Sequence, residues 1–377
     1  MNSEKRITAG YGKERMDLVQ YAFNKSGEVW ENAFQHYLKH TVSFTDFTNG
    51  KLTSQVSVIP FELNLHGVPF KSIGIGYVAS YPEVRGNGAM HRIFEEIEAY
   101  EQEEGIILSL LDPFSYGFYG RFGYVHAYNR LKMTWANQDF PSFPISDYSV
   151  ERLSFEEALP IIQQLHRDAN GTKKGSMVRS EWWWEYWHLK RVPHEKIAVA
   201  FDEYHVAKAY VRYSTNFPTL TIHEWIGENI QSLNALGRFI QSHSSSVENF
   251  VWISPEENPE DVLAFQMMAE KRNVKLEVLP YMQVKINDWH VFLRQYPWKR
   301  DVSHFVFQLD GKSFEMGEAE NKVEVSISKE NFTKLLFSKT SVKQLVFQEE
   351  IVFSSRKGME ELEHALHSEA KALLDEF

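Results

Sequence analysis

The chain has 377 residues, 43% of them hydrophobic and 24% charged, which is the composition of a folded globular protein of roughly two to three domains. It contains no cysteine, and this excludes a disulfide framework, a thiolate nucleophile and a cysteine-ligated metal. The net charge of −11 argues against a nucleic-acid surface, because neutralising phosphates requires clustered Lys and Arg.

The N-terminal segment has no apolar stretch of the kind found in secretory signals. No part of the chain approaches the roughly 18 consecutive apolar residues that a membrane-spanning helix needs. We therefore expect a cytoplasmic protein that does not interact with a membrane.

The first part of the chain predicts a mixed arrangement of helices and strands. Paired amphipathic helices are expected over Asp17–Phe23 and Val29–His40, and a strand over Gln55–Leu65. An apolar strand at Ser72–Ser80 leads through a short loop into a helix, and a second apolar strand follows at Ile106–Leu111. The apolar residues of the helix have the spacing i, i+3, i+4, i+7 of one buried face: Met90, Ile93, Phe94, Ile97 and Tyr100.

The loop between this strand and this helix, Arg85-Gly86-Asn87-Gly88, predicts an anion site. Backbone N–H groups at a helix N-terminus, together with the helix dipole, favour negative charge. The two glycines allow the backbone to approach a ligand closely, and Arg85 adds a cation whose fork geometry suits phosphate. A pyrophosphate-carrying ligand fits this chemistry.

Three local patterns match known motifs only in their letters. Gly74–Ala79 fits the dinucleotide fingerprint G-x-G-x-x-A but lies inside a strand and opens no helix, and glycines in a strand more often mark a bulge. Gly311-Lys312-Ser313 lacks the earlier glycine of a phosphate-binding loop, because Val306 stands there. His36 and His40 share a helix face without the Glu that a zinc protease needs, so we expect no metal.

A strand at Tyr128–Trp135 is expected to close the first module, and the two prolines of Asp139–Pro144 indicate a connector. The aromatic run Glu181–Trp187 is interpreted as packing, with the wall of a substrate pocket as the alternative. The strands Lys196–Phe201 and Ala207–Tyr213 predict a hairpin. The other expected elements of this second module are strands at Tyr148–Leu153, Ile222–Ile226 and Asn249–Ile253, and helices at Glu156–Arg167, at Ser232–Ser242 and from Asp261.

The order of elements in the second module repeats that of the first, but no Arg-x-x-Gly loop occurs, so we expect it to lack a cofactor site. From about Met282 the pattern changes to a small α+β unit. Its expected elements are helices at Asp288–Arg294, Lys329–Leu336 and Glu360–Leu374 and strands at Phe305–Leu309 and Glu324–Ile327. The predicted modules are 1–138, 139–283 and 284–377.

The strand–loop–helix–strand segment, with Pro82 just beyond the strand, the run Phe118–Tyr124 and the final Phe377, resembles the Eis-type ("enhanced intracellular survival") acetyltransferases of the GNAT family. The resemblance spans essentially the whole chain. One departure is Met90, where the general GNAT loop has Gly or Ala, although Eis-type proteins also carry a larger apolar residue there. The resemblance implies two fused GNAT-like mixed-sheet modules followed by a sterol-carrier-like module, an α/β and α+β fold.

The resemblance also implies the roles of individual residues. Acetyl-CoA is the expected co-substrate, and its pantetheine would pair with exposed backbone of the first module. The expected cofactor-binding residues are Val78, Ala79, Ser80, Arg85, Gly86, Asn87, Gly88, Ala89, Met90, His91 and Ser115. Tyr119 is expected to protonate the departing thiolate, because its pKa of about 10 lies near the thiol value of about 8.5. The α-carboxylate of Phe377 is expected to accept a proton from the amine, which requires burial to raise its ordinary pKa of about 3.5.

The expected reaction is direct acetyl transfer to a primary amine of a cationic substrate, either an aminoglycoside-like polyamine or a protein lysine. Phe23, Trp30 and residues near Glu376 are expected to line the substrate pocket, and the negative net charge would attract cations. The resemblance further implies a homo-oligomer, hexameric in the family. The alternative is a ligand-binding protein with a vestigial GNAT core and an apolar ligand in its C-terminal module; the intact loop at Arg85 favours the enzyme.

Overall fold

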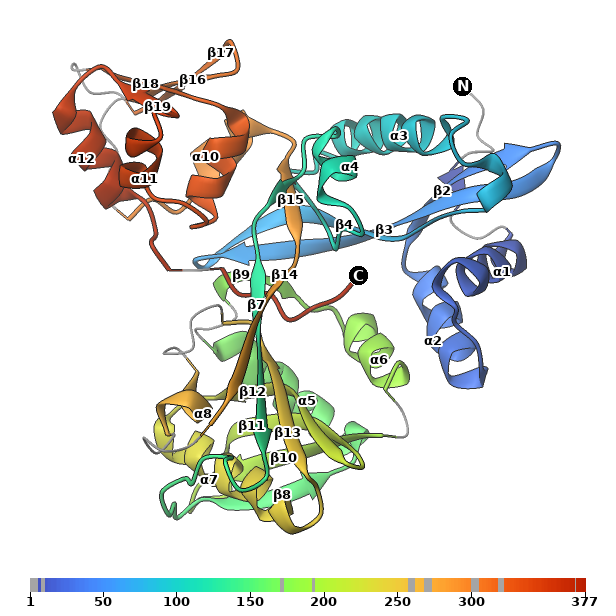
Figure 1. The fold of residues 1–377 in the computed structure, drawn as a ribbon, viewed down its shortest axis with the longest axis vertical. Coiled ribbons are helices and arrows are strands. Elements are labelled where there is room, and N and C mark those ends of the chain that lie inside the picture. Colours follow the sequence, from blue (N-terminus) through green and yellow to red (C-terminus); the bar gives the residue numbers. More distant parts are fainter. Residues whose placement is uncertain are drawn as a thin grey trace.

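Three β-sheets, one for each expected module, organise the described chain (Figure 1). The computed structural model describes residues 6–7, 11–169, 173–191, 194–256, 262–267, 273–299, 305–317, 322–369 and 371–377. Within these ranges no helix is long and apolar enough to cross a membrane. The mixed α/β class with a small third module, predicted from the sequence, is confirmed.

The first sheet has eight strands, and the long antiparallel pair β3–β4 forms its centre. The strand order is β1-β2-β3-β4-β5-β15-β6, and β9 pairs with β3. The strands are β1 (Arg6–Ile7), β2 (Val42–Thr48), β3 (Lys51–Leu65), β4 (Val68–Ser80), β5 (Leu108–Leu111), β6 (Val125–His126), β9 (Lys174–Val178) and β15 (Gln283–Ile286).

Helices cover both faces of this sheet. Val58 of β3 belongs to the apolar cluster that α3 (Ala89–Glu103) completes with Ile93, as the predicted helical spacing requires. The next residue, Ile59, points to the opposite face, because successive strand residues alternate, and packs in the cluster of Phe34 on α2 (Glu28–Lys39). The remaining helices of this module are α1 (Gly12–Phe23), η1 (Pro82–Val84) and α4 (Tyr116–Gly120).

β4 carries a bulge and then diverges from β5. Gln55 pairs with Ala79 and Ser57 with Gly76, so the two residues Tyr77 and Val78 face Val56 alone. Tyr77 has a φ of 46°, the local twist that admits the extra residue. The parallel pairing of β4 with β5 ends at Ile75, so in the described chain the last five residues of β4 pair only with β3. The bulge expected near the strand glycines therefore lies directly after them.

The second sheet has seven strands in the order β14-β7-β13-β12-β11-β10-β8. The predicted hairpin is confirmed as the antiparallel pair β10–β11. The strands are β7 (Asn129–Ala136), β8 (Ser149–Leu153), β10 (Glu195–Phe201), β11 (Ala207–Asn216), β12 (Thr219–Gly227), β13 (Asn249–Ser254) and β14 (Lys275–Pro280). The helices are α5 (Phe155–Asp168), α6 (Glu181–Leu189), α7 (Ile230–Gln241), η3 (Ser242–Ser245) and α8 (Leu263–Gln266). Asp261, the expected start of the last helix, lies outside the described residues.

The two sheets exchange strands, which the sequence did not predict. The strand expected at Tyr128–Trp135 to close the first module is β7, and it lies between β13 and β14 of the second sheet. β15, which follows the second sheet in the chain, returns to the first sheet between β5 and β6. An alternating pattern identifies the two faces of a strand but does not determine its hydrogen-bonding neighbours.

The third module has a four-stranded sheet in the order β17-β16-β18-β19, and its core is continuous with that of the first module. Phe292 of this module contacts Phe70 of β4 with ring centroids 5.1 Å apart. The strands are β16 (Phe305–Leu309), β17 (Lys312–Met316), β18 (Val323–Ile327) and β19 (Ile351–Phe353), and the helices are α9 (Trp289–Gln295), α10 (Lys329–Leu336), α11 (Val342–Phe347) and α12 (Arg356–Ala365).

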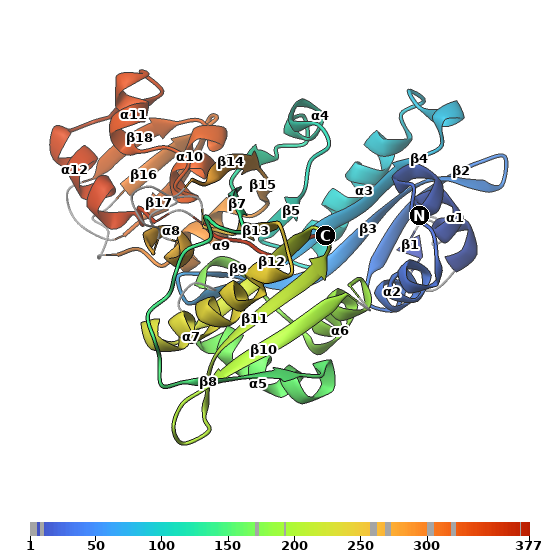
Figure 2. The same ribbon diagram turned by 60° about the horizontal axis from the view of Figure 1, so that its bottom comes forward.

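The helix predicted over Glu360–Leu374 is wrong beyond Ala365, where α12 ends. Residues 371–377 form no helix or strand and run between the first and second sheets to the C-terminus (Figures 1 and 2). This C-terminal segment is largely buried, and distant residues satisfy its backbone: the guanidinium of Arg130 donates to the carbonyl oxygens of Leu373 and Asp375. Because those carbonyls have partners elsewhere in the fold, the segment does not need helical hydrogen bonds.

Candidate functional site

The loop that enters α3 has the backbone geometry of an anion site. Gly86 and Gly88 have φ values of 84° and 82°, which favour glycine. No side chain caps α3 at Gly88, and Asn87 Oδ1 accepts a hydrogen bond from the N–H of Ala89 at 3.0 Å. Arg85 is exposed and pairs with no carboxylate among the described residues. Arg85, whose guanidinium donates to the carbonyl oxygen of Ser80 at 3.5 Å, therefore lies beside a helix N-terminus, a place that favours an anion.

This loop opens into a cavity of about 930 Å³ that also reaches the end of β4, which pairs with β3 but no longer with β5. Ten of the eleven expected cofactor-binding residues line it: Val78, Ala79, Ser80, Arg85, Gly86, Asn87, Gly88, Ala89, Met90 and His91. The eleventh, Ser115, is not among the lining residues; its Oγ caps α4 by accepting from the N–H of Phe118 at 3.4 Å.

The cavity has lining residues that the sequence reasoning did not assign to a cofactor: Ala22, Phe23, Val84, Phe114, Phe118, Arg121 and Phe122. Phe114, Phe118 and Phe122 form an apolar wall from the segment that follows β5. The many aromatic residues of that segment are the feature of the sequence that could have indicated a cavity wall. A turn rich in Phe and Tyr is, however, equally consistent with packing in the hydrophobic core. Arg121 adds a second cation to the lining.

Tyr119 lies behind this aromatic wall. Its side chain is buried, and its ring contacts those of Phe114 and Phe118 with centroids 5.3 and 5.1 Å apart. Burial, and then the nearby carboxylate of Asp112, raise the pKa of Tyr119 well above its ordinary value. The phenol is thus protonated at every physiological pH, and it can donate a proton but is a weaker acid than a free tyrosine.

Phe377 lies against β4, on the strand that supplies the cavity edge. A Cβ at Gly74 would lie 2.8 Å from the ring of Phe377, and one at Gly76 would lie 3.2 Å from its carboxyl carbon. The ring also contacts Phe61, with centroids 5.3 Å apart. The two glycines therefore make room for the terminal residue. Its carboxylate lies over Gly76, two residues before Val78 of the cavity lining.

The aromatic run on α6 serves mainly as packing and as an anchor for the C-terminal segment. Trp183 is fully buried, and its Nε1 donates to the carboxylate of Asp375 at 2.8 Å. The hydroxyls of Tyr186 and Tyr77 are hydrogen-bonded at 2.9 Å, which links α6 to the bulge of β4. The packing interpretation thus holds, and the same residues also contact the terminal segment.

One group of described residues, His66, His367 and Glu369, brings three metal-ligand atoms within 4.8 Å of one another. The two imidazoles are stacked, with centroids 3.5 Å apart and planes at 7°. The nitrogen lone pairs of two stacked imidazoles lie in two parallel planes, whereas a bound metal needs them to converge on one point. Nε2 of His367 also lies 2.6 Å from the carbonyl oxygen of Pro297, so this group is better described as a packed contact than as a metal site.

Comparison with known families identifies two domains. Residues 4–127 and residues 175–286 each match a family model described as an acetyltransferase (GNAT) domain. The first match contains the loop at Arg85, the cavity and Tyr119; the second contains β10–β12 and lacks such a loop. A search of curated proteins gives no match.

Solved structures resemble the chain over nearly its whole length. A conserved protein of unknown function from Enterococcus faecalis, described as a probable N-acyltransferase, is 27% identical, with a TM-score of 0.88 and 99% of both chains covered. A GCN5-related N-acetyltransferase from Anabaena variabilis is 16% identical, with a TM-score of 0.83 over 99% of this chain and 100% of that one. Eis1 from Mycobacterium abscessus is 13% identical, with a TM-score of 0.74 over 97% of each chain. At these last two identities the likeness concerns the fold.

The first matched segment contains all parts of the cavity: the loop at Arg85, the last residues of β4 and the aromatic wall. The second matched segment has a similar order of strands and helices but no comparable loop. The chain therefore contains two acetyltransferase (GNAT) domains followed by a small α/β module, and the loop with the geometry of an anion site belongs to the first of them.

Proposed function

We propose that the protein is an acetyl-CoA-dependent N-acetyltransferase of the Eis type, which transfers acetyl directly to a primary amine. One observation carries the proposal: a single cavity joins the N-terminus of α3, with Arg85, to the side of β4 that has no described strand partner beyond Ile75, and Phe377 lies against that same strand. A nucleotide pyrophosphate fits the first end, and an extended amide chain fits the second.

Acetyl-CoA would be held mainly by backbone groups. Gly86 and Gly88 leave the loop open to phosphates, and Arg85 supplies the fixed positive charge. The last residues of β4, Val78 to Ser80, have no strand partner on the side of β5 among the described residues, so their backbone can pair with the amides of pantetheine. The same N–H groups would polarise the thioester carbonyl.

The proposed reaction is a single displacement at the thioester carbon. The amine nitrogen forms the new C–N bond, the C–S bond breaks, and its electron pair remains on sulfur. The carboxylate of Phe377 takes the proton that the amine loses, and Tyr119 gives its phenolic proton to the thiolate. The raised pKa of Tyr119 keeps the phenol protonated before the reaction, and it also makes the phenol a weaker acid toward the thiolate than a free tyrosine. A covalent acyl-cysteine is ruled out, because the chain has no cysteine.

We propose a cationic amine as substrate, either an aminoglycoside-like polyamine or a protein lysine. Asp112 raises the pKa of Tyr119, so one acidic group lies near the proposed acid, whereas the neighbouring Glu376 is ion-paired with Arg130 at 2.9 Å. Negative charge there would attract an ammonium group. A cytoplasmic location and assembly into a homo-oligomer, hexameric as in the resembling family, belong to the same proposal.

The test is release of CoA from acetyl-CoA in the presence of a panel of amines, followed with a thiol reagent. Because the protein has no cysteine, every thiol detected comes from CoA. Mass spectrometry should show the amine gaining one acetyl group. No amine raising CoA release above the uncatalysed rate, combined with no calorimetric binding of acetyl-CoA, would overturn the proposal. Thermal stabilisation by a fatty acyl ligand but not by acetyl-CoA would favour the ligand-binding alternative instead.

A further inference from the structure

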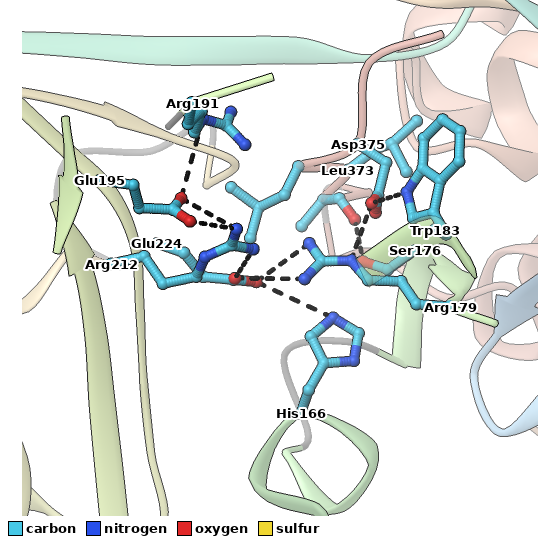
Figure 3. A network of polar contacts seen from close by, with 12 residues as sticks. His166, Ser176, Arg179, Trp183, Arg191, Glu195, Arg212, Glu224, Leu373 and Asp375 are labelled. Carbon is cyan, nitrogen blue, oxygen red and sulfur yellow. Dashed lines mark hydrogen bonds and ion pairs between the residues drawn. The ribbon is translucent and has the colours of Figure 1, made fainter. Parts of the chain in front are cut away.

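The second GNAT domain, which lacks a cofactor loop, encloses a cluster of ionised side chains (Figure 3). Arg212 on β11, Glu195 on β10 and Glu224 on β12 project from neighbouring strands, and Arg179 joins them from the segment between β9 and α6. All four side chains are at most 1% exposed. Burying charge is unfavourable unless each group is paired with good geometry, so the pairing in this cluster needs an explanation.

The cluster is a chain of ion pairs. Arg212 lies 2.9 Å from Glu195 and 3.6 Å from Glu224, and Glu224 lies 3.0 Å from Arg179. His166 is 3.9 Å from Glu224, and burial lowers its pKa to about 3, with the charge of Arg179 adding to the effect. His166 is therefore neutral and contributes no charge to the cluster at physiological pH.

Arg179 extends this chain to the C-terminal segment. Its Nε donates to Asp375 Oδ1 at 2.8 Å, and Trp183 Nε1 donates to the same oxygen at 2.8 Å. Asp375 is fully buried. One guanidinium thus bridges a carboxylate of the second GNAT domain and a carboxylate two residues before the end of the chain.

The charges of the cluster balance only when the C-terminal segment is counted. The described ion pairs between arginines and carboxylates join three guanidinium groups to three carboxylates: Arg179, Arg191 and Arg212, and Glu195, Glu224 and Asp375. Asp375 alone comes from outside the second domain. Without it the domain would bury one uncompensated positive charge, so the cluster is complementary to an anionic ligand.

Asp375 also sets the register of the segment. Two other contacts involve its backbone: Ser176 Oγ donates to the carbonyl of Ala372 at 2.6 Å, and Tyr281 Oη donates to that of Asp375 at 2.5 Å. A second side chain, Glu376, is half-exposed and accepts from Arg130 Nη1 at 2.9 Å. Backbone contacts of this kind would accept other side chains and a shifted register. The buried carboxylate of Asp375, in contrast, is recognised by two specific side-chain donors, Arg179 and Trp183. Phe377 follows two residues later, within about 7 Å of extended chain.

We propose that the second GNAT domain is the binding site for the chain's own C-terminal segment, and that Asp375 and Arg179 are positioning residues that hold Phe377 in place. The inference rests on the proposed role of the Phe377 carboxylate for its catalytic consequence, but the binding itself does not depend on that role.

The test compares Asp375→Asn with wild type in two independent measurements. Asn keeps the size of the side chain and removes its charge. Treatment with a carboxypeptidase, followed by mass spectrometry of the intact chain, should release Phe377 at least about tenfold faster from the variant. In steady-state kinetics kcat should fall about 10- to 100-fold, while KM for acetyl-CoA stays within twofold, because misplacing a reacting group costs rate and not cofactor binding. Glu369→Gln, a change at an exposed carboxylate, is the matched control and should leave both unchanged.

Trp183→Phe is the second variant, because it keeps an aromatic ring at this buried position and removes one of the two side-chain donors to Asp375. It should increase the rate of Phe377 release and lower kcat, each by less than Asp375→Asn does. Calorimetric binding of acetyl-CoA verifies that the first domain is folded in both variants. The double variant Arg179→Met with Asp375→Asn removes one charge of each sign and so restores charge balance. Its rate of Phe377 release should be no higher, and its kcat no lower, than those of Asp375→Asn alone.

Wild-type rates of Phe377 release in both single variants would overturn the proposal. Faster release with unchanged kcat would show that the segment binds there without positioning the reaction. If the wild-type protein transfers no acetyl group but the variants still release Phe377 faster, the binding site for the C-terminal segment is supported and the proposed function is refuted.

Discussion

A methyl group at Gly74 would occupy space that the ring of Phe377 fills. In Gly74→Ala the new Cβ would lie 2.8 Å from Cγ and Cδ1 of that ring and 3.0 Å from Cε1. Carbon atoms in contact prefer about 3.5–4.0 Å, so the ring must withdraw by about 1 Å. Gly74 lies in a paired part of β4, where the backbone cannot retreat easily, and the terminal residue is the part that moves.

A displacement of about 1 Å in a reacting group can reduce a rate about a hundredfold. We therefore expect kcat of Gly74→Ala to fall about 100-fold. Acetyl-CoA should bind with unchanged affinity, because the part of β4 that lines the cavity begins at Val78, four residues after Gly74. Overpacking typically costs about 1–3 kcal/mol of folding stability, and that cost is smaller if the terminal residue yields.

The assay is steady-state CoA release together with calorimetric titration of acetyl-CoA and a thermal melt. Gly12→Ala is the matched control, since the nearest atom to its new Cβ is Leu38 Cδ1 at 4.0 Å, an ordinary contact. A Gly74→Ala protein with wild-type kcat would refute the reasoning, because it would mean that Phe377 does not need its place over β4. Loss of acetyl-CoA binding would instead show that the strand itself had been disturbed.

Four further outcomes are expected. Tyr119→Phe keeps the ring and removes the proton, so turnover should fall about a hundredfold or more with an unchanged melting temperature, and wild-type turnover would return Tyr119 to a packing role. A C-terminal extension turns the carboxylate of Phe377 into a neutral amide, so acetyl-CoA binding by calorimetry should persist while acetyl transfer becomes at least about a hundredfold slower. Full activity in an extended chain verified by mass spectrometry would show that another group is the base. Arg85→Ala should weaken acetyl-CoA binding by about 1.5–3 kcal/mol in calorimetry, and equal affinity would exclude a phosphate contact. Burial lowers the pKa of His166 to about 3, so below about pH 6.5 this side chain gains a proton on unfolding, which destabilises the fold by about 2 kcal/mol at pH 5. The melting temperature of His166→Asn should therefore fall less than that of wild type between pH 7.5 and pH 5. An equal fall would contradict a buried neutral imidazole.

The cofactor half of the site could be predicted because its determinants are local. The loop residues from Arg85 to Gly88 and the apolar face of α3 are contiguous, and the helical spacing of Ile93, Phe94 and Ile97 fixes which side is buried. The site at the other end of the cavity has no such local signal. Phe114 and Phe118 look like core residues until the loop opposite them is known.

The C-terminal half of the site could not be derived from spacing. Gly74 and Gly76 suggested a bulge, and a bulge does follow them, but both also lie in close contact with Phe377, about 300 positions later in the sequence. The apolar residues near Leu374 suggested a helix, whereas the segment is held extended by residues of two other modules. Such contacts depend on the assembled fold, which no periodicity encodes.

The exchange of β7 and β15 also determines how the molecule can be taken apart. Every break in the chain between Ala136 and Gln283 leaves each half with an interior strand of the other sheet and without one of its own. The first GNAT domain therefore cannot be excised as a contiguous fragment with an intact sheet, because its strands β9 and β15 come from far along the chain, whereas all seven strands of the second sheet lie within residues 129–280. The two domains should melt in one calorimetric transition, and an isolated N-terminal half should aggregate through the exposed edges of β5 and β7.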